Sequence, residues 1–354
     1  MSPLLRPITL ERQLGQLLLV GFRGVTPAAA APFLQKMAAL NFGGVVLFDV
    51  DVPSGSPGRN IESPTQLRKL TAALQEAAPT PLLIAVDQEG GRVARLNPER
   101  GFPPTVSHQE LGSRDCLSHT RRSARVMAQT LADAGINLNF APCVDVNLNP
   151  HNPIIGAKER SFSADPAVVA RHAVEFIAAH QEYGVLCALK HFPGHGSSRG
   201  DSHLGLVDVT ECWSPDELSP FRTLIERDCV DMVMTAHIFN RCWDSNSPAT
   251  LSPAVIDGML RSQMGYQGAV ITDDLQMGAI AQHFGLETAV ERAIIAGADL
   301  LMFANNSAYD AEIGEKVIDI LLRLIQEKRL TVERLEQSWA RIRRLKTRLA
   351  KKSA

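Results

Sequence analysis

The segment KHFPGHGSSRGDSH (190–203) concentrates side chains that can bind a metal ion or move a proton, namely Lys190, His191, His195, Asp201 and His203. Imidazole titrates near neutral pH and also ligates metals, so the histidines alone do not decide between these two chemistries. Asp201 stands two residues before His203, where its carboxylate can fix the tautomer of the imidazole. The segment could therefore be a metal site, a catalytic acid and base, or a polar loop.

The metal hypothesis needs three or more ligands with a defined geometry. The HxxxH spacing of His191 and His195 is interrupted by a Pro-Gly pair, which excludes the helical histidine pair of many zinc hydrolases. His237 and Asp273 could still complete a metal site in a barrel-shaped hydrolase. A metal-dependent barrel hydrolase therefore stays open as the second hypothesis.

The elements that must position these residues are visible as short apolar runs that recur along the chain. Runs of this length separated by helical segments are typical of parallel strands buried on both faces. Eight such units in one chain predict an α/β fold, a (β/α)₈ TIM-type barrel, better than an open sheet. The predicted strands are 17–22, 43–48, 82–86, 136–140, 185–190, 231–237, 268–273 and 299–304.

Helical periodicity fills the intervals between these strands, and several of the segments end in glycine, the residue preferred after a helix C-terminus. The predicted helices are 65–78, 118–135, 166–184, 219–228, 252–265 and 286–298. Two further helices, 310–328 and 331–350, follow the eighth strand. We therefore expect one domain over 1–354, with the barrel at about 13–305 and C-terminal helices at about 310–350.

Polar residues stand where several predicted strands end, and in such barrels the reactive groups lie at those ends. Asp87 ends the third strand, Lys190 and His191 end the fifth, and Asp273 ends the seventh. Asp274, one residue later, fits the N-cap of a following helix. These side chains are therefore expected to converge on one rim of the barrel.

Composition excludes several classes of partner. The chain has 36 Lys and Arg against 38 Asp and Glu, which gives a net charge of −2. It therefore lacks the excess of positive charge that binding to nucleic acid or to an anionic membrane requires. The six cysteines show no CxxC spacing and are expected to be reduced. The first apolar run is too short for a secretory signal or a membrane span, so the expected location is the cytoplasm.

Five motifs in order carry a resemblance to a known family. KHFPGHG followed by DSH resembles the signature of glycoside hydrolase family 3, and it is accompanied by DQEGGRV (87–93), KERSF (158–162), MTAH (234–237) and ITDDLQM (271–277). The match spans about 13–305 and is very close to the single-domain bacterial β-N-acetylglucosaminidases of peptidoglycan recycling. It implies a (β/α)₈ barrel, retention of anomeric configuration and no cofactor or metal. The implied reaction removes terminal N-acetylglucosamine from its disaccharide with 1,6-anhydro-N-acetylmuramic acid, with or without the peptide.

The resemblance also implies roles for individual residues. Asp273 matches the nucleophile, His203 the acid and base, and Asp201 the partner that orients His203. Residues that match those holding the terminal sugar are Asp87, Arg95, Arg160, Lys190 and His191. The expected partners are small molecules, namely anhydro-muropeptides and other saccharides that contain N-acetylglucosamine.

These residue types suit the implied reaction. A retaining glycosidase needs a carboxylate that attacks the anomeric carbon and a proton donor for the leaving oxygen. Imidazole can donate that proton near neutral pH, and the glycines of 194–200 allow the loop to move. A catalytically silent muropeptide sensor is a third hypothesis, but a binding protein has no need of the set Asp201, His203 and Asp273.

Overall fold

Eight parallel strands form a barrel in the computed structural model, which describes residues 9–350. The strands are β1 Leu18–Gly21, β2 Gly44–Val46, β5 Leu83–Val86, β8 Leu138–Asn139, β9 Leu186–Phe192, β11 Met232–Thr235, β13 Ala269–Thr272 and β14 Leu301–Phe303. They lie in the order β13-β11-β9-β8-β5-β2-β1-β14. A bridge between Ile271 and Leu300 closes the ring, and the N–H of Thr272 donates to the Leu300 carbonyl over 3.0 Å. The predicted (β/α)₈ barrel is confirmed.

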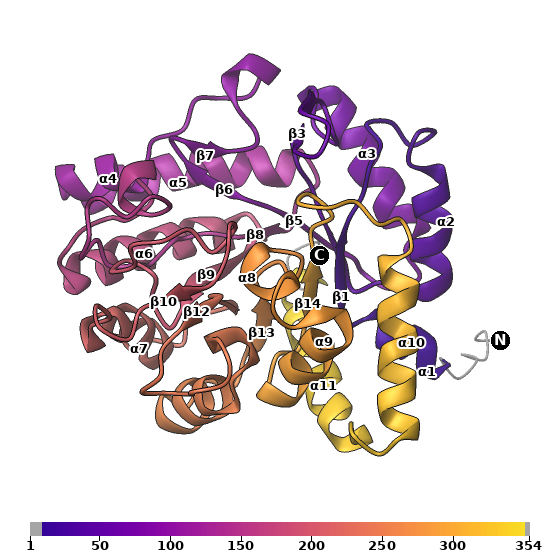
Figure 1. The fold of residues 1–354 in the computed structure, drawn as a ribbon. Coiled ribbons are helices and arrows are strands. Elements are labelled where there is room, and N and C mark those ends of the chain that lie inside the picture. The colour runs from indigo at the N-terminus through magenta and orange to yellow at the C-terminus, as the bar shows by residue number, and fades with distance from the viewer. Residues whose placement is uncertain (1–8, 351–354) are drawn as a thin grey trace.

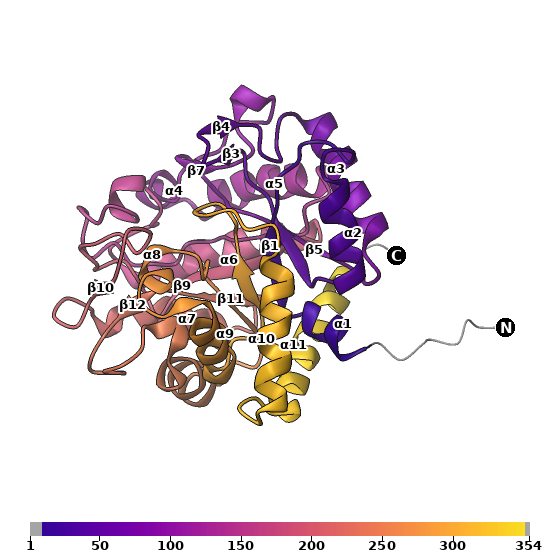
Figure 2. The same ribbon diagram turned by 45° about the vertical axis from the view of Figure 1, so that its right-hand side comes forward.

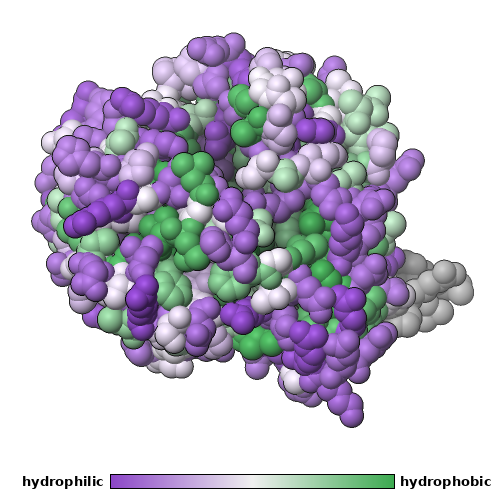
Figure 3. All heavy atoms as spheres, viewed as in Figure 1, coloured by the Kyte–Doolittle hydropathy of each residue, from purple (hydrophilic) through white to green (hydrophobic). Residues whose placement is uncertain are grey.

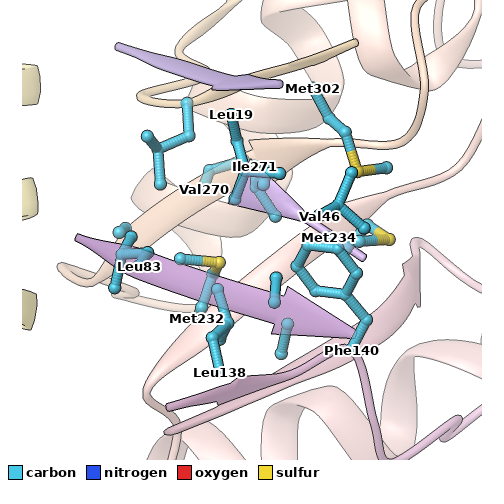
Figure 4. Close-up of a cluster of buried hydrophobic side chains, with 14 of the residues drawn as sticks. Leu19, Val46, Leu83, Leu138, Phe140, Met232, Met234, Val270, Ile271 and Met302 are labelled. Carbon is cyan, nitrogen blue, oxygen red and sulfur yellow. The ribbon is translucent and has the colours of Figure 1, made fainter. Parts of the chain in front are cut away.

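The inside of the barrel is packed with apolar side chains from different strands (Figure 4). Leu19, Val46, Leu83, Leu138, Met232 and Val270 are all fully buried. The continuous apolar runs of the sequence follow from this arrangement, because each strand faces the barrel interior on one side and covering helices on the other. The interior is therefore a solid core, and a ligand site has to lie at its end.

Helices surround the barrel (Figures 1 and 2). The main ones are α2 Ala31–Leu40, α3 Pro64–Ala77, α5 Leu117–Asp133, α6 Pro166–Glu182, α7 Ser219–Glu226, α9 Gly285–Ala296, α10 Ile313–Gln326 and α11 Val332–Ala350, with short helices α1 Leu10–Gly15, α4 His108–Arg114 and α8 Gly278–Ala281. In both views α1, α10 and α11 lie together on one side of the molecule. None of the helices in the described part of the chain has the length and apolar character needed to cross a membrane.

The segment predicted as a helix at 252–265 is helical, but it is a π-helix over Ala254–Gln263. Its last turn has the hydrogen bond between residues five positions apart that defines a π-helix: the N–H of Met264 donates to the carbonyl of Met259 over 3.1 Å. Gly258 lies inside the segment, but a single glycine does not by itself indicate a wider turn. The position of this element was therefore predictable from the sequence and its hydrogen-bond pattern was not.

Short strand pairs that the sequence did not predict shape the loops beyond the barrel strands. The hairpins pair β3 Val50–Asp51 with β4 Ser56–Pro57 and β6 Gln88–Gly90 with β7 Val93–Ala94, and β10 Val207–Asp208 pairs with β12 Ile238–Phe239. Each of these strands is only two or three residues long, which is too short for an alternation of apolar and polar residues to predict it. The face seen in Figure 3 is mostly hydrophilic, with hydrophobic residues gathered in patches near its middle.

Candidate active site

One pocket collects most of the residues that the sequence predicted to converge. Its lining includes the predicted residues Asp87, Arg95, Arg160, Lys190, His191, His203 and Asp273. Met234 and Met302, which belong to the apolar cluster of the barrel interior in Figure 4, also line it. The pocket therefore lies at the end of the core where the strands terminate, as expected for this fold. Asp201 is outside the lining and reaches the pocket through His203.

Asp273 directly follows strand β13, and its carboxylate oxygen accepts the N–H of Asp274 over 2.8 Å. Burial raises the pKa of Asp273, but His237, His191 and His203 lower it by more than burial raises it. The pKa of Asp273 therefore lies below its ordinary value. The side chain is therefore an ionised carboxylate at the edge of the pocket. This is the protonation state that a nucleophile needs.

The neighbouring Asp274 does not cap a helix, which corrects one expectation from the sequence. Helix α8 begins at Gly278 with Met277 as its N-cap residue. The Asp274 carboxylate instead accepts the N–H groups of Gln276 over 3.1 Å and of Ala304 over 3.0 Å, so it ties the segment after β13 to the end of β14. Burial raises the pKa of Asp274 to about 6, so the two adjacent carboxyl groups differ in acidity.

His203 and Asp201 form a pair in the loop that follows strand β9. The Asp201 Oδ1 atom lies 2.8 Å from Nδ1 of His203 and also accepts the backbone N–H of His203 over 2.9 Å. Burial raises the pKa of Asp201, but the hydrogen bonds from His203 outweigh it and the pKa is lowered. The pair therefore holds the proton of the imidazole on Nδ1 or stabilises the doubly protonated ring. In either form, Nε2 makes no hydrogen bond to another described residue, and His203 lines the pocket.

Charged groups of the pocket lining form a connected network with the buried Glu89, which lies outside the lining. The Nζ atom of Lys190 lies 2.6 Å from Asp87 Oδ1 and 2.6 Å from Glu89 Oε1. Arg160 donates two hydrogen bonds to Glu89, over 2.8 and 2.7 Å. Arg95 lies farther out, 3.9 Å from Asp87. Burial lowers the pKa of Lys190, but Asp87 and Glu89 raise it above its ordinary value, so the ammonium group stays charged.

The orientation of His191 is set by Asp145, a residue that the sequence analysis did not identify. Nδ1 of His191 lies 2.7 Å from Asp145 Oδ2, and Nε2 lies 3.2 Å from an Arg160 nitrogen. Arginine only donates, so Nε2 accepts and the proton of the neutral ring is on Nδ1. Asp145 is fully buried, and although burial raises its pKa, His191 and His195 lower it well below the ordinary value.

The metal hypothesis can be tested against the donor atoms. Among the described residues, the group with metal-ligand spacing is Cys143, Asp145 and His191, which differs from the set suggested by the sequence. Asp145 already accepts from the Cys143 thiol over 3.1 Å and from His191. Burial also raises the pKa of Cys143 well above its ordinary value, which disfavours a thiolate ligand. This group fits a hydrogen-bonded network better than a metal site.

Comparison with known proteins shows the family of the chain. The model of the glycosyl hydrolase family 3 N terminal domain matches residues 9–345. The chain belongs to glycosyl hydrolase family 3. Beta-hexosaminidase A of Pseudoalteromonas piscicida is 35% identical, over 98% of this chain and 62% of the relative. Beta-hexosaminidase LpqI of Mycobacterium tuberculosis is 34% identical, over 94% of this chain and 82% of the relative.

Solved structures of family 3 proteins show the same fold. A β-N-acetylglucosaminidase from a Paenibacillus species superposes with a TM-score of 0.87 and 37% identity, covering 97% of this chain and 63% of that chain. The structure of LpqI gives a TM-score of 0.80 and 30% identity, covering 95% of this chain and 93% of that chain. The chain thus spans less than two thirds of the Pseudoalteromonas and Paenibacillus proteins but most of LpqI.

Several residues in or behind this candidate site were missed by the sequence analysis, although simple signals could have found two of them. Glu89 lies two residues after Asp87, and Asp145 follows the fourth predicted strand, so the rule of strand ends applies to both. Lys158, which lines the pocket, lies within the KERSF motif but was not assigned a role. Glu217 accepts the N–H of Gly196 in the loop that leads to His203, but it lies far from any strand end and carries no such signal.

Proposed function

We propose that this chain is a retaining exo-β-N-acetylglucosaminidase that acts through a covalent bond between the sugar and Asp273. The single observation that carries the proposal is that an ionised Asp273 and the Asp201–His203 pair meet at one pocket. Membership of family 3 and the hexosaminidase names of its relatives support the sugar that is removed.

The reaction proceeds in two steps. The Asp273 carboxylate attacks the anomeric carbon while the protonated imidazole of His203 gives a proton to the departing oxygen, which forms a glycosyl ester. A water molecule then attacks the same carbon, His203 takes its proton, and the Asp273 carboxylate is released. Asp87, Arg95, Arg160, Lys190 and His191 hold the hydroxyl groups of the terminal sugar. No metal ion takes part in these steps.

The leaving-group dependence of variants tests this division of labour. Asp273→Ala should abolish turnover of every substrate, because no glycosyl ester can form. His203→Ala should lose roughly 10²- to 10⁴-fold in kcat/KM on sugar leaving groups, which need protonation, and far less on nitrophenyl glycosides. Asp201→Ala should show a milder form of the same pattern. Equal losses for His203→Ala on all substrates, or activity of Asp273→Ala on activated glycosides, would contradict the assigned roles.

For the natural substrate, we propose N-acetylglucosaminyl-1,6-anhydro-N-acetylmuramic acid, with or without its peptide, a fragment of cell-wall turnover. Its leaving group carries carboxylates, and Lys158 supports this choice. The pocket cations Arg95, Arg160 and Lys190 all face carboxylates of the protein. Lys158 is exposed and has no such partner within the described part of the chain. Lys158 and His203 line the same pocket, and the charge of Lys158 also helps to lower the pKa of Asp201.

The variant Lys158→Gln tests this choice by comparing KM for substrates with anionic and with neutral leaving groups. The variant should raise KM roughly two- to fivefold for a substrate whose leaving group bears a carboxylate, the size expected for an exposed charge pair. It should leave KM for the neutral N-acetylglucosamine disaccharide unchanged. Lys69→Gln on α3 is the matched control, because Lys69 is exposed and lies outside the pocket lining. A KM that rises equally for both substrates would argue against an anionic leaving group.

A further inference from the structure

The loop that carries His203 is bonded to the segment that follows the proposed nucleophile. The N–H of Gly278 donates to the carbonyl oxygen of His203 over 3.2 Å, and the N–H of Ala279 donates to that of Ser202 over 3.2 Å. Gly278 stands five residues after Asp273 in the chain. The two segments proposed to supply the nucleophile and the proton therefore contact each other directly through their backbones.

This contact requires glycine at position 278. A Cβ atom there would lie 2.8 Å from the carbonyl oxygen of His203 and 3.0 Å from the carbonyl carbon of Leu204. Both are backbone atoms, so the strain can be relieved only if the loop moves away. Gly278 is not among the residues with a left-handed backbone, so its own conformation accepts alanine. Glycine is therefore needed at position 278 because the backbone of the loop with His203 and Leu204 comes so close to it.

The first part of the same loop is held by other residues. The buried Glu217 carboxylate accepts the N–H of Gly196 over 2.6 Å and also the hydroxyl of Ser197. The side chain of Asn152 donates to the His195 carbonyl over 2.7 Å. A change at position 278 therefore acts on the tip that bears Ser202 and His203 and leaves these anchors in place.

We propose that Gly278 is a positioning residue for proton transfer: its backbone N–H and its lack of a side chain let the loop dock with His203 beside Asp273. The inference rests on the proposed function, because it assumes that His203 donates the proton. It implies that docking of the His203 loop on Gly278 speeds the transfer of a proton to the leaving group and does not affect the attack by Asp273.

The experiment compares Gly278→Ala with Gly205→Ala. Gly205 lies in the same loop, and a Cβ atom there meets nothing within 4 Å, so this variant is the matched control. Gly278→Ala should lower kcat/KM at least tenfold, on the order expected for partial loss of acid catalysis, on the N-acetylglucosamine disaccharide. It should change kcat/KM less than about twofold on the dinitrophenyl glycoside, whose leaving group needs little protonation. Gly205→Ala should match the unaltered chain on both substrates.

A second variant guards against a folding defect at position 278. Ala279→Pro removes the N–H that bonds to Ser202 and adds no side chain at 278, and proline is tolerated in the first turn of a helix. It should show the same leaving-group dependence, while thermal unfolding followed by circular dichroism confirms that both variants fold. Equal losses on the two substrates for both variants would mean a merely structural role and would overturn the inference.

His203→Ala, measured alongside, distinguishes two kinds of failure. If His203→Ala itself shows no leaving-group dependence, the proposed acid and base role is wrong. If His203→Ala shows the dependence but Gly278→Ala behaves like Gly205→Ala, the proposed function stands and the positioning role of Gly278 is overturned.

Discussion

At the scale of single residues, the site depends on buried carboxylates that orient the groups facing the pocket. Asp145 is the clearest example, because its two oxygens accept from the backbone and ring of His191 and from the N–H of His195. Glu89 plays the same part for Arg160 and Lys190. Neither carboxylate lines the pocket, so each acts through the residues that do.

Replacing Asp145 by asparagine should therefore weaken sugar binding. An amide donates as well as accepts, so it can turn the His191 ring to the other tautomer and remove the acceptor that Arg160 uses. We expect kcat/KM to fall by about 10²-fold, part of it through a higher KM, by analogy with other residues that orient a functional histidine. Steady-state kinetics measures this, with Cys143→Ser as the control that keeps a donor to Asp145. Unchanged kinetics together with lower stability would mean that Asp145 serves only the fold.

At the scale of elements, the loop after strand β9 is anchored by Glu217 of the short 3-10 helix Pro215–Leu218. Burial raises the pKa of Glu217 to about 7, although hydrogen bonds from Ser197 and Gly196 lower it. Because this pKa is above the ordinary 4.5, the protonated group favours the folded chain. The contribution is complete below pH 4.5 and is lost as the pH rises through about 7.

Comparing the unaltered chain with Glu217→Gln isolates this effect, since glutamine does not titrate. The free energy of unfolding of the unaltered chain, relative to the variant, should fall by about 3 kcal/mol between pH 4.5 and about pH 8. Urea unfolding at a series of pH values measures the difference. A flat difference over this range would show that Glu217 titrates as it does in the unfolded chain.

Helix α11 contains a second buried group, Lys346, whose Nζ lies 2.8 Å from Gln16 Oε1. Burial lowers the pKa of Lys346 to about 7, so charging the side chain opposes folding below that pH and the penalty vanishes as the pH approaches 10.5. Lys346→Met should raise the free energy of unfolding at pH 7 by up to about 4 kcal/mol. Denaturant unfolding tests this, with the exposed Arg343→Met as control. A destabilised Lys346→Met variant would contradict it.

At the scale of the whole molecule, the sequence predicted what local patterns encode. Continuous apolar runs such as 82–86 located every barrel strand, because burial on both faces leaves a signal within each segment. The contact of Asp145 with His191 spans 46 positions and has no local pattern. The same holds for Glu217 and Gly196, which meet only because the barrel brings β9 next to the segment before α7.

The proposed exo-action predicts where a sugar chain is cut. Asp87, Lys190 and Arg95 line the pocket beside Met234 and Met302 of the core, and in the proposed reaction they hold the outer hydroxyl groups of the terminal sugar, which leaves no place for a further sugar attached to it. Chitin oligomers should therefore shorten by one N-acetylglucosamine at a time. Mass spectrometry of a time course checks this prediction, and early release of internal fragments would contradict it.

The most direct test of the whole account is to identify the residue that bonds to the sugar. A 5-fluoro N-acetylglucosaminyl fluoride has a good leaving group and a destabilised second transition state, so the glycosyl ester should accumulate. Peptide mass spectrometry after digestion should then find the added sugar on Asp273, and Asp273→Ala should remain unlabelled. A label on another residue, or steady turnover without any labelled protein, would contradict the proposed nucleophile.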